Sequence, residues 1–252
     1  MFSIINKIKN CVVKYHYLNY GRGDILDWCT AFFQKQGRDT YTIMDIGCGY
    51  GHDLKNIRKS TVNKIRMFGI EINKSAIHIC EQSNITIFPI DIEKTAIPIE
   101  DHFFDIVIMN QVIEHTKEIF FIFSEVSRIL KPDGIVIIGV PNLASFHNRI
   151  LLFIGQQPTC IDVLGPHIRG FTIPSLKKFI ETDDYFHVSE VKGANFYPFP
   201  PPLSIYLSRA FPGLSVSILF LVEKTEKGGN FVDILIKRKF ETVYRDEPIS
   251  PQ

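Results

Sequence analysis

Short apolar runs alternate with amphipathic stretches through the middle of this chain, and that alternation limits the folds open to it. The apolar runs are strand-length and lack polar faces, as in a parallel sheet that is buried on both sides. They cover residues 41–46, 66–71, 85–90, 104–109 and 135–140, with helical stretches at 53–59, 74–82 and 119–130. Strands that alternate with helices predict βαβ units and a doubly wound α/β sheet with helices on both faces.

The flanks of this region are expected to be less regular. A helix over residues 24–36, capped by Asp24, precedes the first strand. Later elements are predicted at 146–154, 175–181, 187–191 and 215–223, and at 231–240, where Asn230 as a cap favours a helix over a strand. We expect one domain over residues 1–252, with a helical segment (1–40), a first half (41–141) and a second half (142–252). Its irregular parts, 142–172 and 194–213, are expected to cover one face of the sheet.

Charge and cysteine usage exclude several classes of protein. The formal net charge is +1, so the sequence gives no reason to expect a nucleic-acid partner. The five cysteines form no Cys-x-x-Cys pair, and the histidines show no His-x-x-x-His spacing, so we expect neither a disulfide framework nor a metal site. A reducing, cytoplasmic location fits this pattern. No signal peptide is predicted at the N-terminus, and no apolar run approaches the roughly 20 residues of an integral membrane segment.

A glycine-rich loop follows the first predicted strand. Residues 45–51 read Asp-Ile-Gly-Cys-Gly-Tyr-Gly, with glycines at positions 47, 49 and 51. Glycines at such a point allow a tight turn and the close approach of a ligand to the backbone. A dinucleotide-binding loop reads Gly-x-Gly-x-x-Gly, whereas here the third glycine comes one residue earlier.

Acidic residues end the next two strands. Glu71 ends the second strand and Asp91 the third. A carboxylate after the second strand can accept hydrogen bonds from both hydroxyls of a ribose, as in dinucleotide-binding enzymes. These strand ends meet at the crevice where open α/β sheets bind their ligands.

The complete pattern resembles the class I S-adenosylmethionine-dependent methyltransferases. The loop at 45–51 resembles motif I of that family, residues 104–115 its motif after the fourth strand, and residues 128–134 its turn into the fifth. The resemblance is close over residues 40–141 and looser to about residue 182. It implies a Rossmann-like sheet of seven strands, mostly parallel with the last antiparallel, and S-adenosylmethionine as cofactor.

The resemblance also implies which residues hold each part of the cofactor. The glycine loop holds the methionine part, Glu71 the ribose, and Asp91 the adenine amino group, with Ile72 and Ile92 as apolar walls. Glu114 and His115 border the site. The expected cofactor residues are Asp45, Gly47, Cys48, Gly49, Gly51, Glu71, Ile72, Asp91, Ile92, Asn110 and Gln111. Arg22, just before the first helix, is either a partner for the methionine carboxylate or a surface arginine.

Three histidines are candidate catalytic bases: His115, His147 and His167. A hydroxyl acceptor benefits from a group that removes its proton. His115 lies beyond the fourth strand, where a packing role beside the cofactor is equally consistent. His147 and His167 fall where the family places substrate contacts, and the run from His167 to Thr172 resembles a His-x-Arg-x-Phe-Thr segment of many relatives. Arg169 is expected either to hold an anionic group or to brace a lid.

The sequence therefore predicts methyl transfer from S-adenosylmethionine to a hydroxyl of a small molecule or glycan. Two alternatives stay open: a catalytically silent binding protein of the same fold, and a nicotinamide-dependent oxidoreductase, which the glycine spacing disfavours. The aromatic, proline-rich segment at 196–213 reads as a lid or as a contact for a lipid-linked acceptor, which leaves peripheral membrane contact open. Neither the acceptor nor the oligomeric state follows from the sequence.

Overall fold

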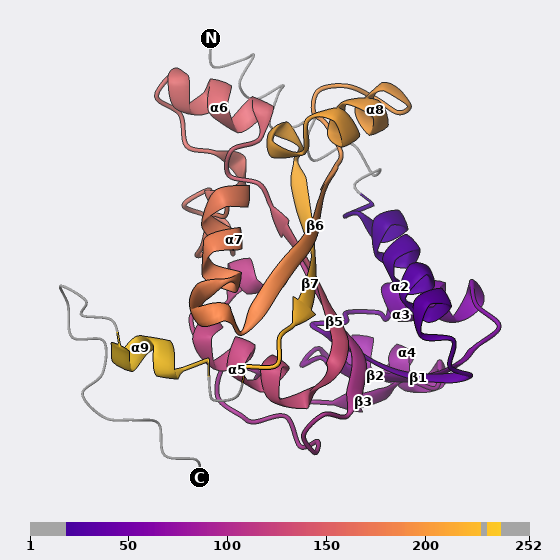
Figure 1. The fold of residues 1–252 in the computed structure, drawn as a ribbon. Coiled ribbons are helices and arrows are strands. Elements are labelled where there is room, and N and C mark those ends of the chain that lie inside the picture. The colour runs from indigo at the N-terminus through magenta and orange to yellow at the C-terminus, as the bar shows by residue number, and fades with distance from the viewer. Residues whose placement is uncertain (1–18, 228–230, 238–252) are drawn as a thin grey trace.

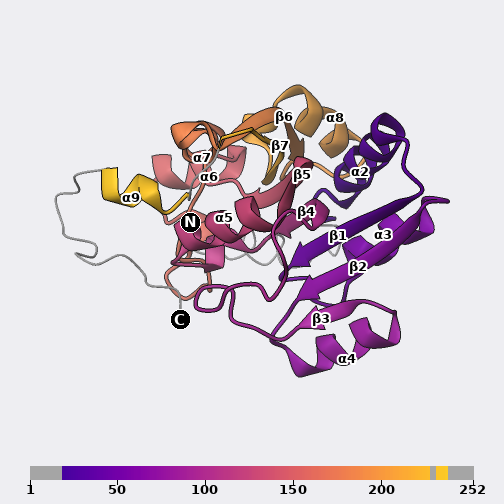
Figure 2. The ribbon, with the colours of Figure 1, turned by 60° about the horizontal axis from the view of Figure 1, so that its bottom comes forward.

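A seven-stranded sheet forms the centre of the computed structural model, which describes residues 19–227 and 231–237 (Figure 1). The strands are β1 (Thr40–Ile46), β2 (Lys64–Ile70), β3 (Thr86–Phe88), β4 (Phe104–Asn110), β5 (Leu130–Pro141), β6 (Phe186–Ala194) and β7 (Ser217–Lys224). Their order is β3-β2-β1-β4-β5-β7-β6, and β7 pairs antiparallel with both β5 and β6. Figure 2 shows β3, β2, β1, β4 and β5 following one another across the sheet. The predicted fold class is confirmed.

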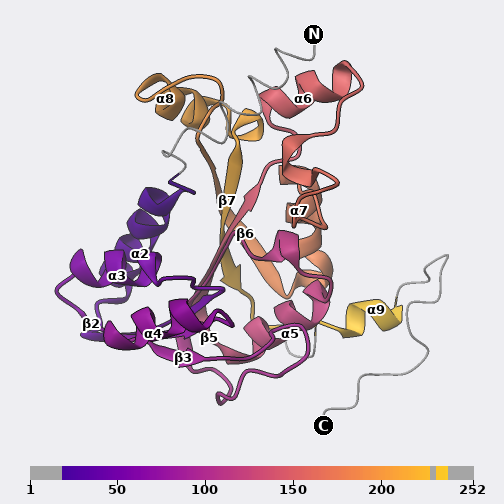
Figure 3. The same cartoon turned by 180° about the vertical axis from the view of Figure 1, so that it is seen from behind.

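Helices cover both faces of this sheet. They are α2 (Arg22–Gln36), α3 (His52–Lys59), α4 (Lys74–Gln82), α5 (Ile119–Ile129), α6 (Phe146–Phe153), α7 (Ile173–Ile180), α8 (Leu203–Ala210) and α9 (Asp233–Lys237). Apolar residues of α5, α7 and α9 pack in one core with Met44 and Val107, whereas those of α2, α3 and α4 pack in a second core with Ile43 and Ile106. Neighbouring strand residues thus point to opposite faces, which is why each strand is apolar throughout. Figure 3 shows the two groups of helices on opposite sides of the strands.

Helix ends differ from the sequence predictions where the capping residue differs. Helix α2 starts at Arg22 after Gly21, which has left-handed backbone angles (φ 72°, ψ 16°), so Asp24 lies in the first turn and the prediction that it caps the helix is wrong. Helix α4 has the predicted bounds because the Asn73 side chain accepts hydrogen bonds from the backbone N–H groups of Ser75 and Ala76. The tail does form a helix, α9, but the proposed cap Asn230 lies outside the described residues.

Strand bounds also shift, mostly by one or two residues. Strand β3 keeps only Thr86–Phe88 of the predicted 85–90, and β5 starts earlier, at Leu130. The irregular stretches contain the short helix α6 with the turn η2 (Thr159–Ile161), and α8 with the turn η4 (Pro212–Leu214). Figure 1 shows α6 and α8 at the same end of the sheet, which is the end that β5 reaches as it leads into α6.

Within residues 19–227 and 231–237, no helix has both the length and the apolar character that crossing a bilayer requires. The prediction that the N-terminus carries no signal peptide concerns residues outside the described part of the chain.

Candidate functional site

A cavity of about 450 Å³ opens beside the carboxyl ends of β1, β4 and β5. Small-molecule sites commonly measure roughly 300–1,000 Å³. Its walls come from the start of α2, the loop after β1, the turn after β4, α6 and the loop before α7. The lining residues include Tyr20, Arg22, Asp45, Gly47, Cys48, Gly49, Asp53, Asn110, Gln111, Glu114, His115, His147, Asn148, Thr159, Cys160 and His167. The cavity therefore joins the predicted cofactor loop to all three predicted catalytic histidines.

The glycine loop is held in a shape that other residues would not adopt. Gly47 has φ +68°, and a Cβ added there would lie 2.7 Å from Cγ2 of Val112. Gly51 has φ +69°, and its Cβ would lie 2.6 Å from Cδ1 of Ile85. The backbone N–H of Gly47 donates to the carbonyl of Ile70 at 2.9 Å, which ties the loop to β2. The loop thus needs glycine for both its backbone angles and its close packing.

Acidic side chains and one arginine surround the base of the loop. Asp45 is buried, and burial together with nearby Asp53 raises the pKa of its carboxyl well above the usual value, while Arg22 lowers it. Arg22 reaches over from the start of α2, with its Nε 3.2 Å from Oδ1 of Asp53. Asp53 itself was not predicted as a site residue; its position early in the helix after the loop was the available signal. Asp45, Asp53 and Arg22 thus form a corner of the cavity that offers acidic groups and a guanidinium to one ligand.

Two polar side chains after β4 keep unused hydrogen-bonding atoms at the cavity. Oδ1 of Asn110 and Nε2 of Gln111 are buried and have no hydrogen-bond partner among the described residues. Gln111 also adopts a left-handed backbone conformation (φ +61°), an unusual one that a residue keeps only where its surroundings impose it. Because unpaired buried polar atoms are costly, both atoms are suited to bind a polar ligand.

Glu71 is oriented by the backbone rather than lying free at the cavity. Its Oε2 accepts from the N–H of Gly49 at 2.9 Å, and its Oε1 accepts from the N–H groups of Ile72 and Asn73 at 2.8 Å each. A carboxylate has about four acceptor positions, so three such bonds leave room for one hydroxyl. Glu71 therefore connects the glycine loop to the end of β2, in addition to any contact with a ribose.

The remaining predicted adenosine residues lie outside the cavity. Asp91 pairs with Lys94, with Oδ2 and Nζ 2.7 Å apart, and that contact lowers the pKa of the Asp91 carboxyl. Ile72 is 71% exposed, whereas Ile92 is buried in the core. Of the predicted cofactor residues, Asp45, Gly47, Cys48, Gly49, Asn110 and Gln111 line the cavity, whereas Gly51, Glu71, Ile72, Asp91 and Ile92 do not.

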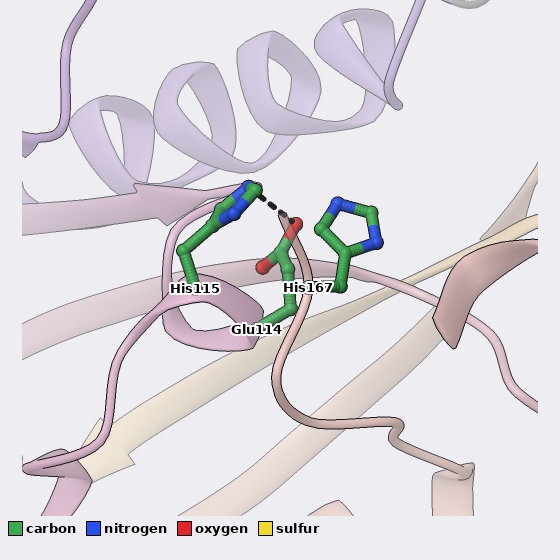
Figure 4. Close-up of side chains that lie close together, drawn as sticks. All are labelled: Glu114, His115 and His167. Carbon is green, nitrogen blue, oxygen red and sulfur yellow. Dashed lines mark ion pairs between the residues drawn. The ribbon is translucent and has the colours of Figure 1, made fainter. Parts of the chain in front are cut away.

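Glu114 forms a group with His115 and His167, and its carboxylate lies between the two histidine rings (Figure 4). Its side chain is 1% exposed, neither carboxylate oxygen has a hydrogen-bond partner among the described residues, and burial raises its pKa to about 7. Oε1 of Glu114 is 3.9 Å from Nε2 of His115. The two histidine rings meet edge to face, with centroids 4.6 Å apart. Burial lowers the pKa of His115, and nearby His167 adds to that shift.

This group is assembled from distant parts of the chain. Glu114 and His115 belong to the short turn η1 (Ile113–His115), while His167 comes from the loop before α7. The sequence argument against a metal site considered only closely spaced histidines and cysteines. It could not identify a group in which His167 lies 52 positions after His115 (167 − 115). Glu114 was predicted as a border residue of the cofactor, and its missing partners were not foreseeable.

His147 has a different environment. Its Nε2 lies 3.0 Å from the Thr159 hydroxyl and its Nδ1 lies 3.3 Å from the Ser145 hydroxyl. Burial lowers its pKa to about 4, so the ring is neutral at pH 7. Asn148 next to it binds both the backbone N–H and the hydroxyl of Thr159. These contacts fix α6 to η2, which makes positioning of the wall the role that the geometry favours for His147.

Arg169 braces the loop that carries His167. Its guanidinium donates to the backbone carbonyls of Thr116 (3.1 Å) and Lys117 (2.7 Å), and it does not line the cavity. The N–H groups of Ile168 and Arg169 both donate to the carbonyl of Glu114. Of the two roles predicted for Arg169, these contacts fit the brace.

Comparison with known proteins points to one family. The sequence profile of a family described as a methyltransferase domain matches residues 44–138. A mouse protein named arginine-hydroxylase NDUFAF5, mitochondrial, is 27% identical over 100 residues, which are 40% of this chain and 29% of that protein. The chain therefore matches less than a third of the length of this curated relative.

Solved structures share the fold at low sequence identity. The 1,6-didemethyltoxoflavin-N1-methyltransferase of Burkholderia thailandensis, solved with S-adenosylhomocysteine, has a TM-score of 0.54 at 13% identity, covering 89% of this chain and 86% of that one. The plantazolicin methyltransferase BpumL has a TM-score of 0.54 at 17% identity, covering 88% and 91%. An Archaeoglobus fulgidus methyltransferase has a TM-score of 0.52 at 17% identity, covering 79% and 94%.

Proposed function

We propose that this chain, which has the fold and the domain of the S-adenosylmethionine-dependent methyltransferases, transfers a methyl group to a hydroxyl of a small molecule or saccharide. The observation that carries the proposal is a single cavity that joins the glycine loop to the Glu114, His115 and His167 group. S-Adenosylmethionine supplies a methyl group already activated by the sulfonium, so the chain's own task is to bind, orient and exclude water.

The corner formed by Asp45, Asp53 and Arg22 fits the amino-acid end of this cofactor. That end carries an ammonium and a carboxylate, and the corner offers two acidic side chains beside one guanidinium. The unpaired atoms of Asn110 and Gln111 add a buried acceptor and a buried donor on the same wall. We place the methionine part here, and the nucleoside toward Glu71 and Asp91 at the next strand ends.

The opposite wall is the proposed acceptor side. His115, His167 and Glu114 line the cavity, and neither carboxylate oxygen of Glu114 has a hydrogen-bond partner among the described residues, so this group can accept or direct the proton that a hydroxyl loses. The fixed wall of α6 and η2, which includes His147 and Thr159, closes the cavity on that side and limits the acceptor's size. Arg169 points away from this wall, so it offers no guanidinium to an anionic acceptor.

A transfer assay tests this proposal. The protein is incubated with S-adenosylmethionine labelled in its methyl group and a panel of hydroxylated sugars and phenols, with carboxylates and amines as comparison acceptors. We expect labelled ether products, and we expect His167→Ala to lower turnover by about tenfold or more while cofactor affinity is unchanged. Labelled amines or esters would redirect the acceptor class, and loss of cofactor binding in His167→Ala would contradict the placement of this wall.

The same experiment also tests a second candidate function, in which the chain does not transfer methyl groups. The relative named arginine-hydroxylase shows that a chain similar to the cofactor half of this one carries a name other than methyltransferase. A silent binding protein of the same fold would bind S-adenosylmethionine but form no methylated product on any acceptor. Binding of NAD in place of S-adenosylmethionine would instead favour an oxidoreductase.

A further inference from the structure

Glu114, His115 and His167 bring one potential ligand atom each into a small volume. A carboxylate oxygen and two imidazole nitrogens all lie within 4.8 Å of one another. Figure 4 shows the Glu114 carboxylate between the two rings. All three residues line the cavity, so an ion among them would keep part of its coordination sphere open to a bound molecule.

The Glu114 carboxylate lacks compensation for its burial. It is 1% exposed, and neither oxygen has a hydrogen-bond partner within the described ranges. Its one ion-pair contact among those residues is the His115 ring at 3.9 Å, and no lysine or arginine of the described chain pairs with it. A buried carboxylate with no partner is costly, so a cation at this position would supply the missing interaction.

The hydrogen bonds of each histidine ring leave Nε2 available to bind a metal ion. Nδ1 of His167 lies 2.7 Å from the carbonyl oxygen of Cys160, and Nδ1 of His115 lies 3.3 Å from that of Pro166. A carbonyl only accepts, so each Nδ1 must carry the proton, which leaves the Nε2 lone pair unprotonated in the neutral ring. Metal-binding histidines show this arrangement, with one nitrogen donating to a carbonyl and the other facing the ion.

The backbone holds the two parts of the group together. The carbonyl of Glu114 accepts the N–H of Ile168 at 2.9 Å and the N–H of Arg169 at 3.2 Å. The Arg169 side chain then fastens the same loop to the carbonyls of Thr116 and Lys117. The His167 loop is therefore fixed on the turn that carries the other two ligands, so little ordering is left for metal binding to impose.

We propose that Glu114, His115 and His167 form a binding site for a divalent first-row transition-metal ion. Two imidazoles and one carboxylate suit zinc, manganese, cobalt or iron(II) better than magnesium or calcium, which prefer oxygen ligands. This inference rests on the proposed methyl transfer: with their lone pairs bound to the ion, the three side chains no longer act as the base, and the ion instead faces the acceptor and lowers the pKa of its hydroxyl. The hydroxyl then gives its proton to solvent, the oxygen–methyl bond forms, and the sulfur–methyl bond breaks with its electron pair going to sulfur.

Metal binding is tested without turnover. The chelator-treated full chain is titrated calorimetrically with Zn²⁺ and with Mn²⁺, in the absence of S-adenosylmethionine. Co²⁺ absorption spectra are recorded in parallel, because a thiolate ligand from Cys160 or Cys48 would give a sulfur-to-metal charge-transfer band. We expect one saturable site without that band, and a loss of affinity of about tenfold or more in Glu114→Gln and in His167→Ala.

His52→Ala is the matched control, because His52 lines the same cavity but belongs to no ligand group. It should bind metal as the unchanged chain does, and thermal unfolding checks that all variants fold. Absence of saturable binding, or equal affinity in Glu114→Gln, His167→Ala and the unchanged chain, would overturn the site. If metal binding fails but methyl transfer proceeds, only this inference falls; if metal binds but no acceptor is methylated, only the proposed function falls.

Discussion

The two walls of the cavity are built in different ways. On the cofactor side, Asp45 and Asn110 sit directly at the ends of β1 and β4, so the sheet itself places them. On the acceptor side, His147, Thr159 and His167 are placed by hydrogen bonds between a short helix and loops. Apolar residues there also stay in solvent: Phe153 is 92% exposed and Leu164 97%. The comparison teaches that one wall belongs to the folding core, whereas the other can vary without disturbing it.

The largest loss of stability is expected for a substitution at Asp105, a buried residue of β4. This carboxylate is 1% exposed, lies 2.7 Å from both Arg38 and Lys131, and accepts hydrogen bonds from the N–H and hydroxyl of Thr42. Asp105→Ala removes a charged partner from both Arg38 and Lys131 and the acceptor of the Thr42 N–H, so it should lower the free energy of unfolding by about 2–4 kcal/mol, as measured by urea denaturation. Asn148→Ala, which breaks the corresponding network on the acceptor wall, should cost clearly less; equal losses would break the contrast between the walls.

The glycine loop provides a matched pair of substitutions. Gly47→Ala combines a left-handed backbone with a clash against Val112, whereas Gly49→Ala has φ +50° but nothing within 4 Å of the added Cβ. We expect Gly47→Ala to cost about 2–3 kcal/mol in stability and Gly49→Ala about 1–2 kcal/mol. Thermal unfolding of both variants measures this difference. A larger effect at Gly49 would mean that packing against Val112 is not what fixes the loop.

Glu71 and Asp91 allow a comparison between a carboxylate bonded to the glycine loop and one at the edge of the sheet. Glu71→Ala removes three acceptor contacts to backbone N–H groups, so it should weaken S-adenosylmethionine binding by about 1–3 kcal/mol. Asp91 is paired with Lys94 at the sheet edge, so Asp91→Ala should weaken binding by less, roughly 0.5–1 kcal/mol. Calorimetric titration of the two variants checks the order, and unchanged affinity in Glu71→Ala would remove it from the site.

The acceptor wall should show its own pH dependence through His147. Burial lowers the pKa of its imidazole to about 4, below the unfolded value, so the unfolded chain binds this proton more readily. The contribution of His147 to stability is therefore intact above pH 6.5 and is lost as the pH falls toward 4. Between pH 7 and 5 the loss should be about 2 kcal/mol. His147→Gln should flatten this part of the unfolding profile, and an unchanged profile would show that His147 titrates normally.

The smallest effect should come from the exposed apolar side chains near α6. Phe153 is 92% exposed and buries little surface, so Phe153→Ser should change the stability by no more than about 0.5 kcal/mol. The same substitution in the core, Phe123→Ser, serves as the control and should be strongly destabilising, because Phe123 is 1% exposed. A large stability loss in Phe153→Ser, seen by urea denaturation, would show that this wall is part of the core after all.

What the sequence could predict follows the same division. The strands, the helix over Lys74–Gln82 and the glycine loop depend on residues that are close in the chain, and their periodicity or capping identifies them. The antiparallel β7 was predicted from the family resemblance and not from local pattern. The start of α2 was misplaced because a left-handed glycine cap, Gly21, has no side-chain signal.

The geometry of the acceptor wall could not be predicted from the sequence, because it depends on contacts between residues that are distant in the chain. His115 and His167 were each proposed from the family resemblance, but their meeting around a buried Glu114 depends on the backbone bonds that Ile168 and Arg169 make. Asp53 was missed because its position early in the helix after the loop indicates nearness to the site but not that it will pair with Arg22. The roles of all the cofactor residues stay predictions, and among them Gly51, Glu71, Ile72, Asp91 and Ile92 do not line the cavity.

The central claim is that the glycine-loop wall binds S-adenosylmethionine. Calorimetric titration of the purified chain with S-adenosylmethionine, with NAD as the comparison ligand, tests it most directly. The account predicts saturable binding of S-adenosylmethionine at one site, weakened in Glu71→Ala, and no binding of NAD. Saturable binding of NAD without binding of S-adenosylmethionine would contradict it.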